Sequence, residues 1–336
     1  MLRLPPFSYL APRTLSAAVR LLADHDPAET MLVAGGTDLY PNMKRRQFEP
    51  RQLVGLRHIR EIQALTGDPQ HGLSIGGGMT LTQISHHPTV VAAYPALATA
   101  AGLVSTPQLR NMGTIGGNLC VDTRCNYYNQ TYWWRQAIGF CMKKDGDTCW
   151  VAPGSTRCWA VSSSDTAPVM LALDAQVRLV GPQGERLIPV YDLYRDDGIR
   201  YLGKRQDEIL THILLPPTDG WRMHYFKLRR REAFDFPILG VAAALRLAND
   251  GTCTDARLVL GAVASAPLVA SEASTQLIGR RLTPEVIEAA AEMAFKPAKP
   301  LDNTDLLLSY RKKMVRVHIA RTLRHLAAVP SPPPRG

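Results

Sequence analysis

The residues most suited to chemistry are five cysteines between Asn118 and Asp165, out of six in a chain of 336 residues. The first is Cys120, and the other four are spaced C-x15-C-x7-C-x8-C, as Cys125, Cys141, Cys149 and Cys158. Structural zinc sites usually use close cysteine pairs, whereas an iron–sulfur cluster can take four thiolates from a wandering loop. A disulfide framework is not expected without an export signal. The spacing alone leaves a zinc site, an iron–sulfur cluster and free thiols open.

Aromatic side chains are concentrated in the same stretch of the chain. They are Tyr127, Tyr128, Tyr132, Trp133, Trp134, Phe140, Trp150 and Trp159. They would shield a metal cluster from water and tune its potential, or they would form the small core that an inserted loop needs. This composition favours the cluster slightly. The sixth cysteine, Cys253, stands alone near an expected turn and is interpreted as an ordinary buried thiol.

Two glycine-rich segments could hold a phosphate group. The first, GGTD at 35–38, follows an apolar run of strand length, and its glycines let backbone N–H groups approach an anion closely. The second, GTIGGN at 113–118, adds Thr and Asn side chains that hydrogen-bond phosphates or carbonyls. Either segment alone could be an ordinary tight turn. The glycine spacing is not that of a dinucleotide fingerprint, so a Rossmann fold is disfavoured.

The sequence around these segments predicts alternating helices and strands in the first two thirds of the chain. Thr14 is expected to cap a helix over 15–24. Hydrophobic patterning also predicts strands over 30–34, 52–56 and 73–75, helices over 94–104 and 167–173, and a hairpin of 176–180 with 186–190.

The last third of the chain reads as strands followed by helices. After an expected linker at 214–220, the patterning predicts strands over 223–228, 241–247 and 257–263. It also predicts one helix that begins at Thr283–Pro284 and a second helix over about 305–326. This order predicts an α+β second domain. The Pro-rich end of the chain, 329–336, is predicted to be disordered.

The charge balance is basic, with 39 Lys and Arg against 29 Asp and Glu and a formal net charge of +10. The basic clusters at 44–46, 229–231 and 311–313 are short and widely separated. They favour solvated, ion-paired surfaces, and no nucleic-acid motif accompanies them. No run approaches about 18 uncharged apolar residues, and two prolines interrupt the N-terminal segment where a signal peptide would be apolar. We expect a cytoplasmic protein that binds neither nucleic acid nor membrane.

These segments together resemble the flavoprotein subunits of the xanthine-oxidase family of molybdenum enzymes. The matching segments are AGGTD at 34–38, GTIGGN at 113–118, SDTAP at 164–168, FSYLAPRTL near the N-terminus, FKLRRREAFDFPILGVA from Phe226 and SYRKKM from Ser309. The resemblance implies an α+β fold, with a two-subdomain, PCMH-type FAD-binding domain over 1–218 and a smaller α+β domain over 221–328. Most members run almost directly from GGN to the SDxxP segment. This chain inserts roughly 40 residues there, at about 121–162, and the insertion is similar to one that binds an additional [4Fe-4S] cluster in some members.

The resemblance implies that the chain binds FAD through both glycine-rich segments. In the family's pattern, 32–39 and 114–118 wrap the pyrophosphate and ribityl chain, Asp165 hydrogen-bonds the adenosine side, and Lys227 lies near the flavin. The implied FAD-binding residues are Leu32, Val33, Ala34, Gly35, Gly36, Thr37, Asp38, Leu39, Ser105, Gln108, Asn111, Thr114, Gly116, Gly117, Asn118, Asp165, Leu210 and Lys227. The implied cluster ligands are Cys125, Cys141, Cys149 and Cys158, with Cys120 outside the quartet.

The resemblance also implies an electron-transfer subunit of an oxidoreductase, with no catalytic residue in this chain. Ferredoxin would deliver electrons through the [4Fe-4S] cluster and the FAD to a [2Fe-2S] subunit. A molybdopterin subunit would then use them to remove the para-hydroxyl group of 4-hydroxybenzoyl-CoA, giving benzoyl-CoA. The three subunit types would form a heterohexamer, and the positive charge of this chain would attract an acidic ferredoxin.

Two alternatives stay open. The first is a molybdenum hydroxylase flavoprotein that passes electrons from another substrate to an external acceptor. The second is a zinc-stabilised protein that binds nucleic acid through its basic surface, with salt-sensitive affinity.

Overall fold

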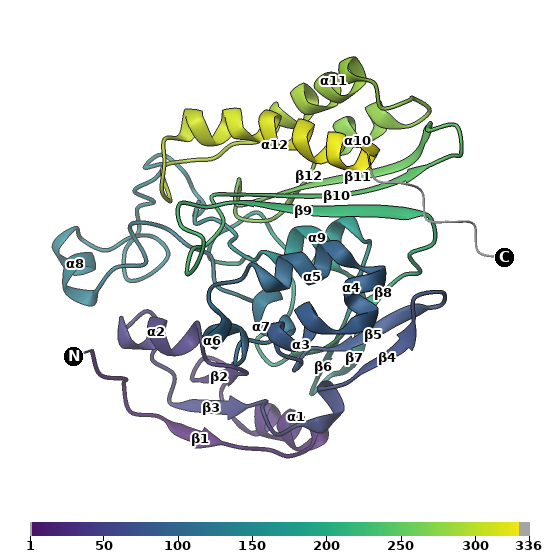
Figure 1. Cartoon of the computed structure of the whole chain (residues 1–336). Helices are drawn as coiled ribbons and strands as arrows, with labels where there is room; N and C mark the ends of the chain where they lie inside the picture. Colours follow the sequence, from purple (N-terminus) through teal and green to yellow (C-terminus); the bar gives the residue numbers. More distant parts are fainter. Residues whose placement is uncertain (1, 329–336) are drawn as a thin grey trace.

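The computed structural model describes residues 2–328, so the predicted disordered tail at 329–336 lies outside the described residues. This part of the chain forms three sheets, each covered by helices (Figure 1). The predicted α+β fold with its two-subdomain first part is confirmed. Within 2–328, no helix is both long enough and apolar enough to cross a membrane.

The first sheet is parallel and has the order β1–β3–β2. Its strands are β1 (Ser8–Leu10), β3 (Gln52–Gly55) and β2 (Thr30–Val33). The predicted helix α1 (Leu15–Asp24) is confirmed, and the Thr14 hydroxyl caps it by accepting a hydrogen bond from the Ala17 amide at 3.2 Å. Helix α2 (Leu39–Lys44) follows β2. The GGTD segment therefore leaves the carboxyl end of a parallel strand, where such sheets commonly bind ligands.

The second sheet is antiparallel and has the order β4–β5–β8–β6–β7. Its strands are β4 (Leu65–Asp68), β5 (Gly72–Gly76), β8 (Ile209–Leu215), β6 (Gln176–Gly181) and β7 (Gly184–Pro189). The predicted hairpin of β6 and β7 is confirmed. The predicted linker at 214–220 is wrong at its first two residues. Leu214 and Leu215 pair with β5 and complete β8, so the connection begins at Pro216.

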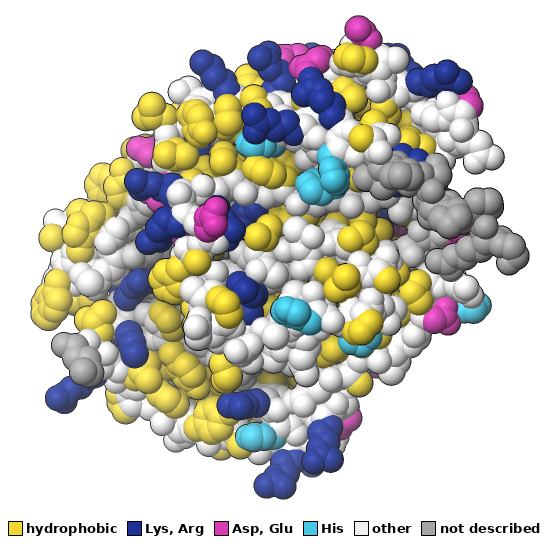
Figure 2. Space-filling view, viewed as in Figure 1, with side chains coloured by type: hydrophobic (Ala, Val, Ile, Leu, Met, Phe, Trp, Pro, Cys, Tyr) yellow, Lys and Arg dark blue, Asp and Glu magenta, His cyan; other side chains and the backbone are white. Residues whose placement is uncertain are grey.

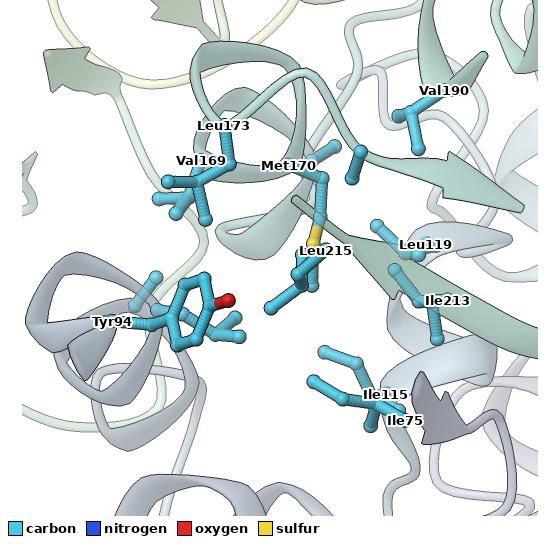
Figure 3. Packing of buried hydrophobic residues seen from close by; sticks show 14 of the residues in the cluster. Ile75, Tyr94, Ile115, Leu119, Val169, Met170, Leu173, Val190, Ile213 and Leu215 are labelled. Carbon is cyan, nitrogen blue, oxygen red and sulfur yellow. The ribbon is translucent and has the colours of Figure 1, made fainter. Parts of the chain in front are cut away.

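Short helices cover this second sheet. They are α3 (Leu81–His86), α4 (Pro88–Ala93), α5 (Pro95–Gly102), α6 (Pro107–Arg110), α7 (Ile115–Leu119) and α9 (Thr166–Ala172), with 3-10 turns η1 (Arg60–Ile62) and η2 (Val190–Leu193). Figure 3 shows Tyr94, Met170 and Ile213, from three separate segments, within one packed core. Helix α7 and helix α9, which flank the cysteine-rich insertion in sequence, both belong to this core.

The third sheet is antiparallel and has the order β12–β11–β10–β9. Its strands are β9 (Trp221–Leu228), β10 (Leu239–Leu247), β11 (Cys253–Gly261) and β12 (Leu268–Val269). The outer helices are α10 (Ser271–Leu277), α11 (Pro284–Phe295) and α12 (Leu308–Ala328), the last beginning three residues later than predicted. Figure 1 shows the sheet between these helices and the pair α5 and α9.

Both faces of the third sheet are buried, which follows from the alternation of side chains along a strand. On β10, Ala242 and Ala244 pack into the core of the second sheet. Val241, Ala243 and Leu245 pack instead beneath the outer helices. The third sheet therefore packs against the core of the second sheet on one face and against the outer helices α10, α11 and α12 on the other.

The cysteine-rich insertion between α7 and α9 contains one helix, α8 (Tyr132–Ala137), among the described residues. Figure 1 shows it projecting from one side of the molecule, next to α2. Its ends meet where the backbones of Arg124 and Val161 bond to each other in both directions, at 2.8 and 2.7 Å. Arg135 on α8 donates to the carbonyls of Arg45 and Arg46 at 3.1 and 3.0 Å, which fastens the insertion to the end of α2.

The basic residues do not form one continuous surface on the face that Figure 2 shows, where Lys and Arg side chains occur in separate groups. In the 229–231 cluster, Arg231 pairs with Asp235 at 2.5 Å and Arg230 with Asp305 at 3.6 Å. This pairing agrees with the interpretation of short, ion-paired basic clusters.

Candidate functional site

The GGTD segment forms a tight loop between β2 and α2. A Cβ atom on Gly35 would lie 2.0 Å from the carbonyl oxygen of Met112, so only glycine permits this approach. Gly36 has a φ of +68°, in the left-handed region that favours glycine. No intramolecular hydrogen bond of the described chain uses the backbone amides at 35–38. A run of consecutive free amides can bind a phosphate group.

The GTIGGN segment differs, because its amides bond within the protein. The hydroxyl of Thr114 accepts a hydrogen bond from the Gly117 amide at 3.1 Å and caps α7. The Gly116 amide donates to the Gly77 carbonyl at 2.9 Å. A Cβ atom on Gly116 would lie 2.8 Å from that same oxygen. These glycines therefore allow two loops to pack closely, and they do not present a row of free amides.

Asn118 joins the two segments that the insertion separates in sequence. Its Oδ1 accepts hydrogen bonds from the buried hydroxyls of Ser164, at 2.9 Å, and Thr166, at 2.7 Å. Its Nδ2 has no hydrogen-bond partner among residues 2–328 and is available to donate to a ligand. The structure thus connects 35–38, 112–118 and 164–166 through direct contacts.

Asp165 and Lys227 form a buried ion pair between the start of α9 and the end of β9. The Lys227 ammonium donates to Asp165 Oδ2 at 2.8 Å and to the Leu103 carbonyl at 3.0 Å. The Tyr225 hydroxyl donates to Asp165 Oδ1 at 2.8 Å. Burial raises the pKa of Asp165, while the charge of Lys227 opposes this effect. Since protein groups engage both carboxylate oxygens, a direct bond from Asp165 to the adenosine stays a prediction.

The other predicted FAD-binding residues lie around these loops. Ser105 has a φ of +47° and accepts a backbone hydrogen bond from Phe234 at 3.1 Å. Gln108 and Asn111, on and just after α6, are exposed, whereas Leu210 on β8 is buried. Two non-glycine residues with left-handed backbones, Ser105 and Phe234, are therefore bonded to each other beside α6, and such strain often marks functional sites.

Arg124 is a site residue that the sequence interpretation missed. Its buried guanidinium pairs with the Asp38 carboxylate and donates to Asn42 Oδ1 at 3.2 Å. It also lies 4.6 Å from the centre of the Phe236 ring. Burial lowers the pKa of Arg124 to about 10. Because Arg124 directly precedes Cys125, it connects the GGTD loop to the first cysteine of the quartet, and no spacing rule marks it in the sequence.

The four cysteines of the quartet are free and buried. All six cysteines of the chain are free thiols in the structure. The quartet is 5–8% exposed, and Cys125, Cys141 and Cys158 share one apolar cluster with Tyr128 and Ala160. Tyr128 and the partly buried Tyr127 therefore contribute to a small core that contains the thiols, whereas Trp133, Trp134 and Trp150 are exposed.

Electrostatic contacts connect all four thiols. Burial raises the pKa of Cys125 to about 12, and the Cys158 and Cys141 thiols add to the shift. Burial raises the pKa of Cys158 to about 11, with further contributions from Cys149 and Cys141. Within 2–328, however, no three His, Cys, Asp or Glu side chains stand close enough to hold a metal ion together. The sulfur atoms are gathered around Cys158 without forming a closed ligand set.

The family of the chain follows from sequence profiles that match nearly all of it. Residues 5–218 match the FAD binding domain in molybdopterin dehydrogenase, and residues 224–326 match the CO dehydrogenase flavoprotein C-terminal domain. The chain therefore belongs to the FAD-binding flavoproteins of the molybdopterin dehydrogenases. More narrowly, it is an FAD-binding subunit of the xanthine oxidase and CO dehydrogenase type, as its relatives indicate.

Individual relatives are similar over more than nine tenths of their length. The nicotinate dehydrogenase FAD-subunit of Eubacterium barkeri is 26% identical over 312 residues, which are 92% of each chain. The carbon monoxide dehydrogenase medium chain of Afipia carboxidovorans is 29% identical, over 96% of this chain and 97% of that one. The solved structure of reconstituted CO dehydrogenase from Oligotropha carboxidovorans has a TM-score of 0.79 and 26% identity, covering 97% of this chain and 99% of that one.

Proposed function

We propose that this chain is the FAD- and [4Fe-4S]-binding electron-transfer subunit of a 4-hydroxybenzoyl-CoA reductase. The observation that carries the proposal is the presence of four buried free thiols, at 125, 141, 149 and 158, in an insertion whose ends adjoin the flavin segments. Three of these thiols, at 125, 141 and 158, share one apolar cluster. The substrate reaction would take place in a partner subunit, and this chain would transfer electrons to it.

The groups that the protein leaves available fit FAD. The free amides at 35–38 would bind the pyrophosphate, and Asn118 Nδ2 would donate to an oxygen of the cofactor. Lys227, fixed by Asp165, would place a positive charge beside the flavin. Bound FAD would supply a carrier that takes up and releases electrons. Apart from these groups, the FAD-binding residues named from the resemblance remain predictions.

The donor set of the insertion fits a [4Fe-4S] cluster in type, number and burial. Four buried thiols, three of them in one apolar cluster with Tyr127 and Tyr128, match the cysteine ligands that an iron–sulfur cluster requires. The raised pKa values of Cys125 and Cys158 mean that these thiols stay protonated until a metal displaces their protons. The Ala160 amide donates to Cys158 Sγ at 3.4 Å, a contact that would stabilise a bound thiolate.

The proposed electron path begins at a ferredoxin and passes through the [4Fe-4S] cluster and the FAD. It continues through a small [2Fe-2S] subunit to a large molybdopterin subunit, in a cytoplasmic heterohexamer. The alternative is a molybdenum hydroxylase subunit that passes electrons outward, and the dehydrogenase names of the relatives favour that direction. The cysteine insertion favours the reductase.

Iron and flavin analysis tests the cofactor assignment. We expect the purified chain to contain FAD and about four irons. Changing Cys125, Cys141, Cys149 or Cys158 to Ser would remove the iron and leave the FAD, whereas C253S, the matched control, would keep both. Retention of iron in any quartet variant would overturn the ligand set. A colourless protein that contains zinc would overturn both cofactors.

A separate assay tests the substrate. The complex with its partner subunits would be incubated with 4-hydroxybenzoyl-CoA and a strong reductant, and benzoyl-CoA would be measured. Absence of benzoyl-CoA from a complex with full iron and flavin would overturn the reductase assignment while leaving the cofactor assignment in place.

A further inference from the structure

Lys143 is a buried cation inside the cysteine-bearing insertion. Its side chain is 6% exposed. Its ammonium donates to Asp122 Oδ1 at 2.7 Å, to Thr123 Oγ1 at 2.5 Å and to the Gly198 carbonyl at 2.6 Å. An ammonium group has three donors, so these three acceptors satisfy it and fix its position. A buried charge requires such partners, and Asp122, itself 5% exposed, supplies the opposite charge.

Gly198 places this cation next to a cysteine of the quartet. The Gly198 amide donates to the Cys158 carbonyl at 2.9 Å. A Cβ atom on Gly198 would lie 2.7 Å from Cys158 Sγ, so the glycine backbone packs directly against the sulfur. One backbone residue therefore separates the Lys143 ammonium from the thiol. The contact also acts electrostatically: burial raises the pKa of Cys158, and the charge of Lys143 opposes that rise.

The ion pair also lies next to the flavin segments. Asp122 lies three residues after Leu119, the last residue of α7, on the segment that leads from GTIGGN into the insertion. The Lys143 ammonium stands 4.8 Å from the centre of the Tyr128 ring, in the apolar cluster of the thiols, and 5.3 Å from that of Tyr201. The cation is thus between the core of the insertion and the segment that continues from the flavin site.

We propose that Lys143 sets the reduction potential of the cluster at the quartet, with Asp122 as the opposing charge. The inference rests on the proposed function, because it requires a [4Fe-4S] cluster at these cysteines. Reduction of a cluster adds one negative charge to the metal and its thiolates, and the net charge nearby is one of the factors that set the potential. A fixed cation beside one ligand stabilises the reduced form, and a carboxylate bonded to that cation weakens the effect. Lys143 is a positioning residue for charge and ligates no metal.

Two substitutions of opposite sign test this role. K143M removes the cation, and the midpoint potential of the cluster would shift to a lower value. D122N leaves the cation without its opposing charge, and the midpoint would shift to a higher value. The matched control is K144M, because Lys144 is the adjacent lysine and its side chain is 35% exposed and paired with Asp145. Its midpoint would stay at the wild-type value.

The measurement is a redox titration of the complex purified with its partner subunits, followed by the EPR signal of the reduced [4Fe-4S] cluster. Iron content is determined on every sample. Opposite shifts in K143M and D122N would support the inference. Unshifted midpoints at full iron content, shifts of the same sign, or loss of iron from both variants would overturn it. Absence of a [4Fe-4S] cluster from the wild-type complex would instead overturn the proposed function, and the inference with it.

Discussion

The guanidinium of Arg124 forms an ion pair with the carboxylate of Asp38, so the residue before Cys125 is bonded to the last residue of the GGTD loop. The Arg124 side chain is 9% exposed and that of Asp38 is 32% exposed. The GGTD loop and the start of the insertion are therefore joined by an ion pair that is largely shielded from water.

Removal of this ion pair is expected to weaken both parts of the site. R124M leaves Asp38 partly buried without its cation, and we expect a loss of about 3 kcal/mol in unfolding free energy together with a lower FAD content. Urea unfolding and flavin absorbance measure the two effects. The matched control is R231M, because the Arg231 side chain is 68% exposed in its pair with Asp235. Ion pairs that water reaches contribute little to stability, so R231M should unfold and bind FAD much as the wild type does. Equal effects of the two substitutions would contradict the prediction.

A methyl group on Gly35 is expected to abolish FAD binding. G35A places Cβ against the Met112 carbonyl, a backbone atom that cannot move without displacing the GTIGGN segment. The flavin-to-protein ratio after purification would fall to near zero. G154A is the control, since its Cβ would meet no atom within 4 Å, and it should retain full flavin. Normal flavin content in G35A would show that the loop is not close to the cofactor.

Truncation of Asn118 is expected to separate the two flavin segments. N118A removes the acceptor of the Ser164 and Thr166 hydroxyls and leaves both buried hydroxyls short of a partner. Each unsatisfied hydroxyl would cost about 1–3 kcal/mol of unfolding free energy. Because the two flavin segments would no longer be joined, FAD would bind more weakly in a flavin fluorescence titration. The control is N249A, at an exposed turn, which should bind FAD as the wild type does.

His318 is expected to make stability depend on pH. It stacks on Phe226 with ring centres 3.8 Å apart, and burial, with a smaller contribution from Arg321, lowers its pKa to about 4. The ordinary value is about 6.5, so between these values the unfolded chain binds a proton that the folded chain does not. The contribution of neutral His318 to the unfolding free energy is therefore fully present above about pH 6.5, and it is lost as the pH falls toward 4.

The variant H318L should lose this part of the pH dependence. Urea midpoints at pH 7.5 and 5.5 would differ less in H318L than in the wild type. Substitution of the exposed His71 by Gln should leave the difference unchanged. A wild-type midpoint that is the same at both pH values would refute the prediction.

The sequence predicted the local features of the site better than its tertiary contacts. The strand and the glycine loop of GGTD follow from local patterning. The structure adds the helix α2 after the loop, and free amides at 35–38 that agree with an anion-binding loop. The second loop looked the same in the sequence. Its amides are nevertheless occupied, because Gly77, from a distant segment, accepts the bond from Gly116. Only the folded chain shows which of the two glycine loops has free backbone amides.

The same limit explains the other differences. The connection at 214–220 was predicted from its prolines, but Leu214 and Leu215 had partners available in β5. Strand β1, with three residues, carries too little periodicity for prediction and exists because β3 lies beside it. Arg124 and Lys143 look like ordinary surface charges in sequence, and their roles come from burial and from partners in other segments.

Because the backbones of Arg124 and Val161 are hydrogen-bonded neighbours, the insertion leaves and re-enters the body of the protein at one point. Excising 125–160 would require only a short turn to reconnect the chain, and no strand of the three sheets would be cut. The cysteine-bearing segment is therefore a module whose removal would leave every strand of the flavoprotein sheets in the chain.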